Sequence, residues 1–169
     1  MLPVEQIDLQ EQLTPDFKML EFLESDAAKR LGIDMHNPPA EIVTNIRKTA
    51  LKVQEARDIW GIPVVIHNCW RPLELNRALG SRDTSAHVEA LAADLALLSM
   101  ANQQAFDKLS AHPTFMLDVD QLIIERGCVH MGLPCKASGY QPRRELRSEA
   151  WIDGARHYPL IRIWKAPHV

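Results

Sequence analysis

The segment Thr84–Leu97, TSAHVEALAADLAL, is mostly small and apolar, yet it contains His87 and Asp94, two side chains of types that bind metal ions. Imidazole and carboxylate groups are both ligands of zinc in proteins. On a continuous helix this spacing would place them on one face about 10 Å apart, too far for two ligands that each lie about 2 Å from one ion. On a continuous strand the odd spacing would place them on opposite faces. We therefore expect the segment to bend, with His87 in a loop and Asp94 on a strand at 91–97.

Taken alone, the pair also fits a simpler interpretation. His87 could be a hydrogen-bonded core histidine and Asp94 an unrelated surface aspartate, because two-residue patterns often arise by chance. The rest of the chain has to decide between a metal site and this alternative.

Four stretches, in order along the chain, fit one recurrent signature. The leading segment is DFKMLEFLESDAAKRLGI. VVIHNCWRPLELNRALG fits V-x-x-G-Y-R-S-x-x-L-N-x-x-x-G at Arg71, Leu75, Asn76 and Gly80. SAHVEALAAD fits S-x-H-x-x-G-x-A-x-D at Ser85, His87, Ala92 and Asp94, with Ala90 in the glycine position. DQLIIERGCVHMGL fits D-Q-L-I-x-E … W-V-H-V-S at Asp120, Gln121, Glu125, Val129 and His130, with Cys128 in the tryptophan position.

Together these stretches resemble the zinc D-alanyl-D-alanine carboxypeptidases and their relatives, which include the L-alanyl-D-glutamate endopeptidases of phage lysins and the hedgehog domains. The likeness covers about residues 17–132 and leaves a C-terminal extension at 136–169. The fold that it implies is α+β and hedgehog/DD-peptidase-like, a small, mostly antiparallel sheet flanked by helices.

The resemblance implies a zinc ion bound by His87, Asp94 and His130, with a fourth position open to water. It further implies that Arg71 binds substrate and stabilises the developing oxyanion. Ser85 would form a hydrogen bond near the ligands or the substrate, although it could equally be a turn residue. Arg71 has its own alternative, an ordinary surface ion pair.

The general base is less directly indicated. In relatives a carboxylate often lies three residues before the last histidine, where this chain has Gly127. Glu125 is the only acid between Asp120 and His130, and we expect a break in the strand at Arg126–Gly127 that turns it toward the metal. Gly127 could provide that break through backbone angles closed to other residues. The alternative is that Glu125 is a solvated charge at a strand end.

Cys128 lies two residues before His130, so a continuous strand would direct both side chains to the same face. Cys128 could then be a small residue lining the pocket, or a fourth zinc ligand that closes the site. The histidines outside the signature are interpreted as structural or surface residues: His36, His67, His112, His157 and His168.

The elements that would position these side chains can be predicted from local patterns. Helices are expected at 25–32, with Ser25 as N-cap, at 39–61, between Pro39 and Gly61, and at 102–112. A strand is expected at 62–70, followed by a short helix or turn at 71–80, and two short strands are expected around Arg126–Gly127. The basic, proline-marked tail is predicted to end in a strand at 158–164.

Composition sets the outer limits. The chain has 169 residues, 46% of them hydrophobic and 24% charged, which suits a single domain over 1–169. A net charge of −3 argues against a nucleic-acid-binding protein, and no apolar run reaches the length of a membrane span. Three cysteines without a C-x-x-C pair indicate neither a disulfide framework nor a zinc finger. No signal peptide is recognisable, so we expect synthesis in the cytoplasm. Two sites of action fit this: the cell wall after phage-type release, or the inside of a bacterial cell.

Two functions follow from the resemblance. The first is a zinc metallopeptidase that hydrolyses peptidoglycan stem peptides, either as a D-Ala-D-Ala carboxypeptidase or as an L-Ala-D-Glu type endopeptidase. The second is a non-catalytic, zinc-stabilised binding domain on the same fold, with Cys128 closing the metal site. The oligomeric state is open.

Overall fold

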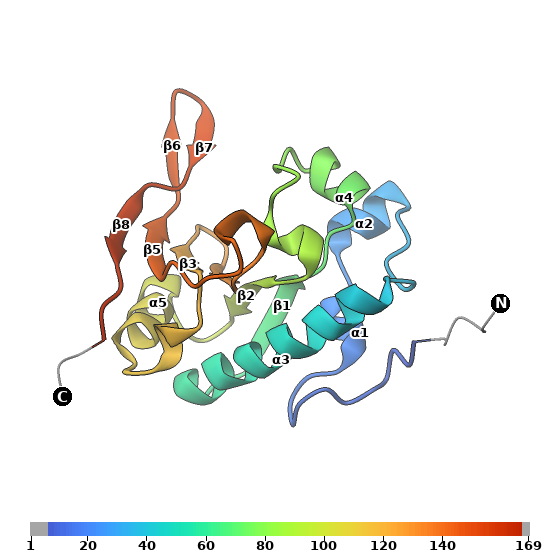
Figure 1. The fold of residues 1–169 in the computed structure, drawn as a ribbon, viewed down its shortest axis with the longest axis horizontal. Coiled ribbons are helices and arrows are strands. Elements are labelled where there is room, and N and C mark those ends of the chain that lie inside the picture. The colour runs from blue at the N-terminus through green and yellow to red at the C-terminus, as the bar shows by residue number, and fades with distance from the viewer. Residues whose placement is uncertain (1–6, 167–169) are drawn as a thin grey trace.

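A six-stranded sheet forms the centre of the protein, whose computed structural model describes residues 7–166 (Figure 1). The strand order is β1-β2-β4-β3-β5-β8, and β6 and β7 form a separate two-stranded ribbon. The strands are β1 (Val64–Asn68), β2 (Ala92–Leu97), β3 (Gln121–Ile124), β4 (Val129–Gly132), β5 (Glu145–Ser148), β6 (Ala150–Ile152), β7 (Ala155–His157) and β8 (Leu160–Ile163).

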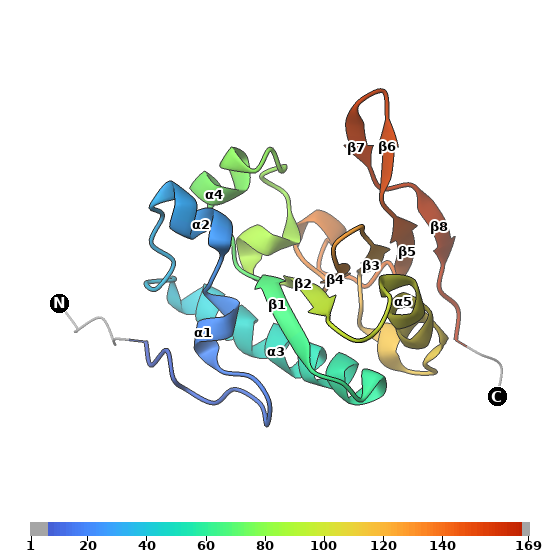
Figure 2. The same cartoon turned by 180° about the vertical axis from the view of Figure 1, so that it is seen from behind.

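All neighbouring strands in the large sheet are antiparallel except β3 and β5, which run parallel. The β6–β7 ribbon projects away from the body of the molecule, as both views show (Figures 1 and 2). The expectation of an α+β fold with a mostly antiparallel sheet flanked by helices is therefore confirmed.

The helices begin and end largely where local signals place them. They are α1 (Met19–Phe22), α2 (Asp26–Leu31), α3 (Ala40–Trp60), α4 (Leu73–Ala78) and α5 (Asn102–Ala111), with shorter 3-10 turns η1 (Ala86–Glu89), η2 (Phe115–Leu117) and η3 (Lys136–Ser138). Ser25 Oγ accepts the N–H of Ala28 at the start of α2. Gly61 ends α3 in the left-handed conformation, with φ 70°, which glycine adopts at no steric cost.

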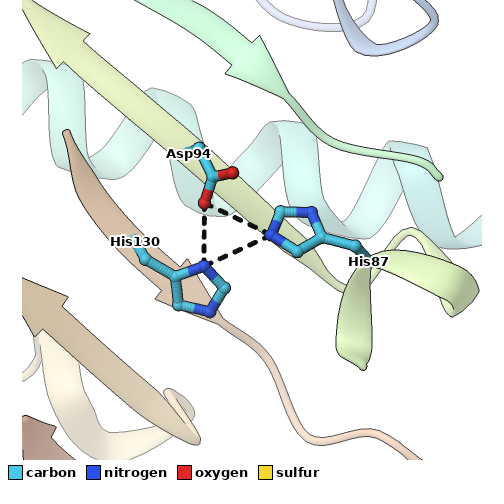
Figure 3. Close-up of side chains that lie close together, drawn as sticks. All are labelled: His87, Asp94 and His130. Atoms are coloured by element: carbon cyan, nitrogen blue, oxygen red, sulfur yellow. Dashed lines mark hydrogen bonds and ion pairs between the residues drawn. The ribbon is translucent and has the colours of Figure 1, made fainter. Parts of the chain in front are cut away.

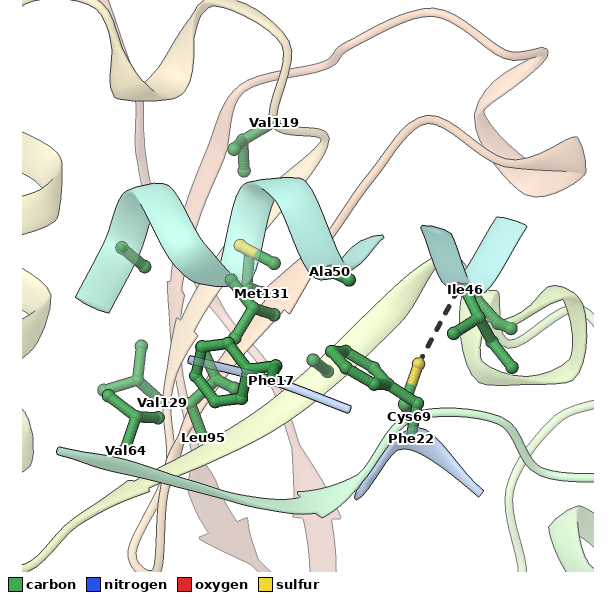
Figure 4. Close-up of a cluster of buried hydrophobic side chains, with 14 of the residues drawn as sticks. Phe17, Phe22, Ile46, Ala50, Val64, Cys69, Leu95, Val119, Val129 and Met131 are labelled. Carbon is green, nitrogen blue, oxygen red and sulfur yellow. Dashed lines mark hydrogen bonds between the residues drawn. The ribbon is translucent and has the colours of Figure 1, made fainter. Parts of the chain in front are cut away.

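The hydrophobic core lies between α3, α5 and one face of the sheet. Alternate residues along the strands supply that face, including Leu95 on β2 and Val129 and Met131 on β4 (Figure 4). Ile46 and Ala50 of α3 are fully buried against it. The opposite face of the sheet carries Asp94 on β2 and His130 on β4.

The tail differs most from the prediction. The strand expected at its end is present as β8, but β5 and the β6–β7 ribbon were not predicted. β5 has the sequence ELRS, with Leu146 as its single fully buried residue, so it carries too little alternation to be recognised. Within residues 7–166, no helix has the combined length and apolar character needed to cross a membrane.

Candidate metal centre

The register of two strands brings Asp94 and His130 together. Asp94 on β2 is directly opposite His130 on β4 in the antiparallel pair. Side chains opposed in this way have Cβ atoms about 4.5–5.5 Å apart and point to the same face of the sheet. Two candidate ligands are thus placed side by side by backbone pairing.

His87 lies on η1, and a sharp bend between η1 and β2 brings its side chain close to Asp94 and His130. The bend is made at Ala90, which adopts the left-handed conformation with φ 55° and ψ 27°. The buried Thr49 hydroxyl donates to the Ala90 carbonyl at 2.7 Å and fixes the bend to α3. The predicted change from loop to strand between His87 and Asp94 is confirmed, and the left-handed backbone explains why a glycine suits position 90 in the signature.

The three donor atoms form a tight triangle (Figure 3). Asp94 Oδ1 lies 2.8 Å from His130 Nδ1 and 3.2 Å from His87 Nε2, and the two imidazole nitrogens are 3.3 Å apart. Ligands about 2.0–2.1 Å from a tetrahedral zinc ion lie about 3.3 Å from one another. The spacing and the two-histidine, one-carboxylate donor set therefore fit zinc, and His87, Asp94 and His130 can hold a metal ion.

A hydrogen bond to a backbone carbonyl fixes the orientation of the His87 ring. Its Nδ1 lies 2.7 Å from the carbonyl oxygen of Cys69, to which it donates a hydrogen bond. The lone pair of Nε2 is therefore free to bind a metal ion at the triangle. Such an outer hydrogen bond is the usual support of a metal-binding histidine. The sequence did not reveal Cys69 in this role, because the acceptor is a backbone atom and carries no residue-type signal.

Electrostatics keep the ligands in the forms that bind metals. Burial lowers the pKa of His87 and so favours the neutral form of its imidazole. Burial opposes ionisation of Asp94, but its hydrogen bonds and electrostatic interactions with the His87 and His130 side chains outweigh this and hold the pKa of Asp94 well below its usual range. A neutral imidazole and an ionised carboxylate are the required ligand states.

Arg71 borders the triangle. Its Nη2 donates to Asp94 Oδ2, the oxygen outside the triangle, and its backbone N–H donates to the His87 carbonyl at 2.9 Å. Its Nε is buried and has no partner within the described chain. A buried, unpartnered guanidinium N–H is costly in a resting protein.

Glu125 lies on the same face of the sheet as the candidate ligands. The β3 and β4 strands are joined by a turn at Arg126–Gly127, closed by the Glu125 N–H donating to the Cys128 carbonyl at 3.0 Å. Glu125 is thus opposite Cys128, which shares a face with His130 two residues later. The predicted break is confirmed. Gly127 does not use the left-handed conformation, so the proposed role of its conformational freedom is wrong.

Burial, followed by the negative charge of Asp94, raises the pKa of Glu125. The Cys128 thiol lies 3.6 Å from Glu125 Oε2, where it donates to the carboxylate. Cys128 is not among the side chains that converge within the described metal-binding group. Its thiol pKa is also raised, chiefly by burial.

Ser85 and the histidines outside the signature are not part of the donor triangle. Ser85 precedes η1 and its side chain caps nothing there, so its part in substrate binding stays a prediction. Of the histidines set aside, His36, His67 and His157 are exposed and His112 is half-buried. His168 lies outside the described residues.

Comparison with known proteins adds one positive finding. A protein-family model described as Peptidase M15 matches residues 15–131, more than half of the chain, and this span contains every residue of the triangle. No curated protein matches the chain.

Proposed function

Because the chain belongs to the peptidase M15 family, we propose that it is a zinc-dependent peptidase that hydrolyses stem peptides of peptidoglycan. The observation that carries the proposal is the donor triangle, with His87 oriented by the Cys69 carbonyl and Asp94 held ionised. Zinc bound there would polarise the substrate carbonyl and lower the pKa of the attacking water.

The protein side chains would supply the remaining chemistry. Glu125 would accept a proton from the attacking water and deliver it to the leaving amine. A carboxyl group whose pKa is raised holds such a proton more readily, which suits the second of these transfers. Arg71, whose Nη2 contacts Asp94, would place its guanidinium charge near the oxygen of the reacting carbonyl, where negative charge develops.

Two bonds of the stem peptide are candidates for cleavage: the terminal D-Ala-D-Ala bond and the L-Ala-D-Glu bond. A D-Ala-D-Ala carboxypeptidase needs a group that captures a terminal carboxylate, whereas an L-Ala-D-Glu type endopeptidase needs room for substrate on both sides of the bond. We further propose that the enzyme acts at the cell wall after phage-type release, and that residues 1–169 form one domain, since β5 and β8 extend the same sheet.

A non-catalytic domain with Cys128 as a fourth ligand is the alternative. The contact between Cys128 Sγ and Glu125 Oε2 favours the open site, because it directs the thiol to the carboxylate. An open coordination position is the feature that separates catalytic from structural zinc sites.

The test is digestion of purified peptidoglycan by the zinc-loaded protein, followed by mass spectrometry of the fragments. We expect new stem-peptide termini that disappear with a chelator and return when zinc is restored. Loss of a terminal D-Ala would identify a carboxypeptidase, and release of free N-terminal D-Glu would identify the endopeptidase. Intact stem peptides after digestion with fully zinc-loaded protein would contradict the proposal.

A further inference from the structure

The C-terminal segment, which lies beyond the family match, shares the sheet face of the metal centre. Asp94, His130, Ile123 and Arg147 are direct neighbours in register across β2, β4, β3 and β5. Neighbouring strands are about 4.8 Å apart, so the backbone of Arg147 lies about 10 Å from that of His130. Residues in register across a sheet point to the same side, so Arg147 stands on the face of the candidate ligands.

Arg147 fastens a later part of the tail over that face. Its Nη1 donates to the carbonyl oxygen of Tyr158 at 2.6 Å, and its Nε donates to Glu145 Oε2 at 3.0 Å. Tyr158 lies in the connection between β7 and β8. The arginine therefore holds the backbone of Tyr158 on the site side of β5.

Glu149 joins the same segment to the turn that carries Glu125. The Glu149 N–H donates to the Ile124 carbonyl at 2.8 Å, and Glu149 Oε2 accepts the N–H of Arg126 at 2.7 Å. The Glu149 side chain is only 10% exposed, although its bond to the Arg126 N–H lies at the surface. The tail and the Glu125 turn are thus fixed to each other.

The phenol of Tyr158 lies within electrostatic reach of the site. Burial first, and then the charge of Glu125, raise the pKa of Tyr158 to about 12, and the charge of Asp94 acts in the same direction. The phenol is therefore protonated at neutral pH and can donate a hydrogen bond. The guanidinium of Arg156, on β7, lies over the Tyr158 ring, 5.9 Å from the ring centre.

The two tyrosines of the chain differ in how their hydroxyl groups are used. Tyr140 donates to Glu89 Oε2 at 3.1 Å. The Tyr158 hydroxyl makes no hydrogen bond with any side chain or backbone group of residues 7–166. A half-buried phenol in the segment that Arg147 fastens to the sheet thus retains its donor for a ligand.

We propose that Tyr158 is a substrate-binding residue, whose hydroxyl donates a hydrogen bond to the peptide held beside Glu125, and that the C-terminal segment forms this side of the substrate site. The inference rests on the proposed peptidase function. It assigns a substrate contact to a part of the chain that the family match does not include.

The first measurement is steady-state cleavage of a synthetic stem pentapeptide by zinc-loaded Tyr158→Phe protein. Loss of one neutral hydrogen bond should raise KM about 3- to 10-fold, with kcat, zinc content and melting temperature close to wild type. Tyr140→Phe is the matched control and should leave KM unchanged. An unchanged KM in Tyr158→Phe would overturn the inference.

The second measurement does not depend on turnover. With 3-fluorotyrosine incorporated, the chain carries two fluorine reporters, assigned by the two Tyr→Phe variants. In zinc-loaded Glu125→Gln protein, which should bind but not cleave the pentapeptide, we expect the Tyr158 resonance to move on peptide addition and the Tyr140 resonance to stay. Peptide binding seen by calorimetry with a stationary Tyr158 resonance would overturn the peptide contact and leave the peptidase proposal intact. If wild type neither binds nor cleaves the peptide, the proposed function fails, and the inference fails with it.

Discussion

Asp94 and His130 face each other across the β2–β4 pair, with Oδ1 of the carboxylate 2.8 Å from Nδ1 of the imidazole. Their separation is therefore set by strand register. A slip of one residue between these strands would move one of the two side chains to the core face, so the register and the metal site must form together. Both residues lie on inner strands of the sheet, where a partner strand on each side holds the register.

His87→Ala should lose zinc, because only two of the three donors would remain. If zinc is present at about 100 times its dissociation constant, the wild type gains about 2.7 kcal/mol of stability from binding, which the variant should lack. Metal analysis after dialysis and thermal unfolding with and without zinc measure both effects. His67→Ala, at an exposed histidine on β1, is the control and should bind zinc normally. A fully loaded His87→Ala protein would exclude this metal site.

Cys128→Ala should retain zinc, because the thiol contacts Glu125 and stands outside the donor triangle. Stability should fall by roughly 1 kcal/mol, as expected for removal of a small buried group. Metal content is again the deciding measurement. Loss of zinc in this variant would support the closed, non-catalytic site.

Arg71→Lys should reduce kcat about 10²- to 10³-fold, the usual effect of losing an oxyanion donor, because an ammonium group cannot bind Asp94 and substrate in the same forked geometry. Zinc content should remain near that of wild type. Arg77→Lys alters an exposed arginine on α4 that pairs with Asp83, and its activity should not change. Wild-type turnover in Arg71→Lys would show that Arg71 has no catalytic role and only forms an ion pair with Asp94.

Glu125→Gln should keep fold and zinc while hydrolysis falls about 10²- to 10⁴-fold, because an amide cannot accept the proton of water. Glu74→Gln, at an exposed position on α4, serves as the comparison. Cleavage at the wild-type rate by Glu125→Gln would assign the base to another residue.

In the metal-free protein, Glu125 should titrate above the ordinary carboxyl value of 4.5, because burial and the charge of Asp94 both disfavour its ionised form. Zinc places positive charge beside Asp94 and should lower the pKa of Glu125. Carboxyl ¹³C shifts followed against pH, assigned with Glu125→Gln, report both values. In the active enzyme, kcat/KM should rise with pH through the pKa of the loaded form. A Glu125 that titrates below 4.5 without metal would contradict this account of its surroundings.

The sequence predicted the parts of the site that depend on local geometry. The spacing of His87 and Asp94 required a bend, and the position of Glu125 relative to His130 required a turn; both are present. Arg71 was expected at the end of a strand, and it follows β1. These predictions hold because the parity of a strand and the pitch of a helix constrain side chains over a few residues.

Contacts made by backbone atoms or by distant segments were not predictable in this way. The carbonyl that orients His87 would be the same for any residue at position 69. β5 is recognisable only from its partner, because a parallel pair joins segments more than 20 residues apart and ELRS has no distinctive pattern of its own. Tyr158 reaches the site through that pairing, so its position could not be read from the tail.

The parallel pairing of β3 with β5 also bears on aggregation. A chain shortened to the end of the family match would retain every candidate metal ligand, but it would leave β3, with the sequence QLII, as an open edge. Short apolar, β-branched strands with unpaired N–H and C=O groups readily recruit strands from other molecules. In the full chain the edge lies at β8, where Pro159 immediately before the strand and Arg162 within it discourage further pairing, while Leu160, Ile161 and Ile163 stay exposed. The tail thus covers the edge of β3, and a protein trimmed to the family boundary should precipitate more readily than one in which β3 and β5 are paired.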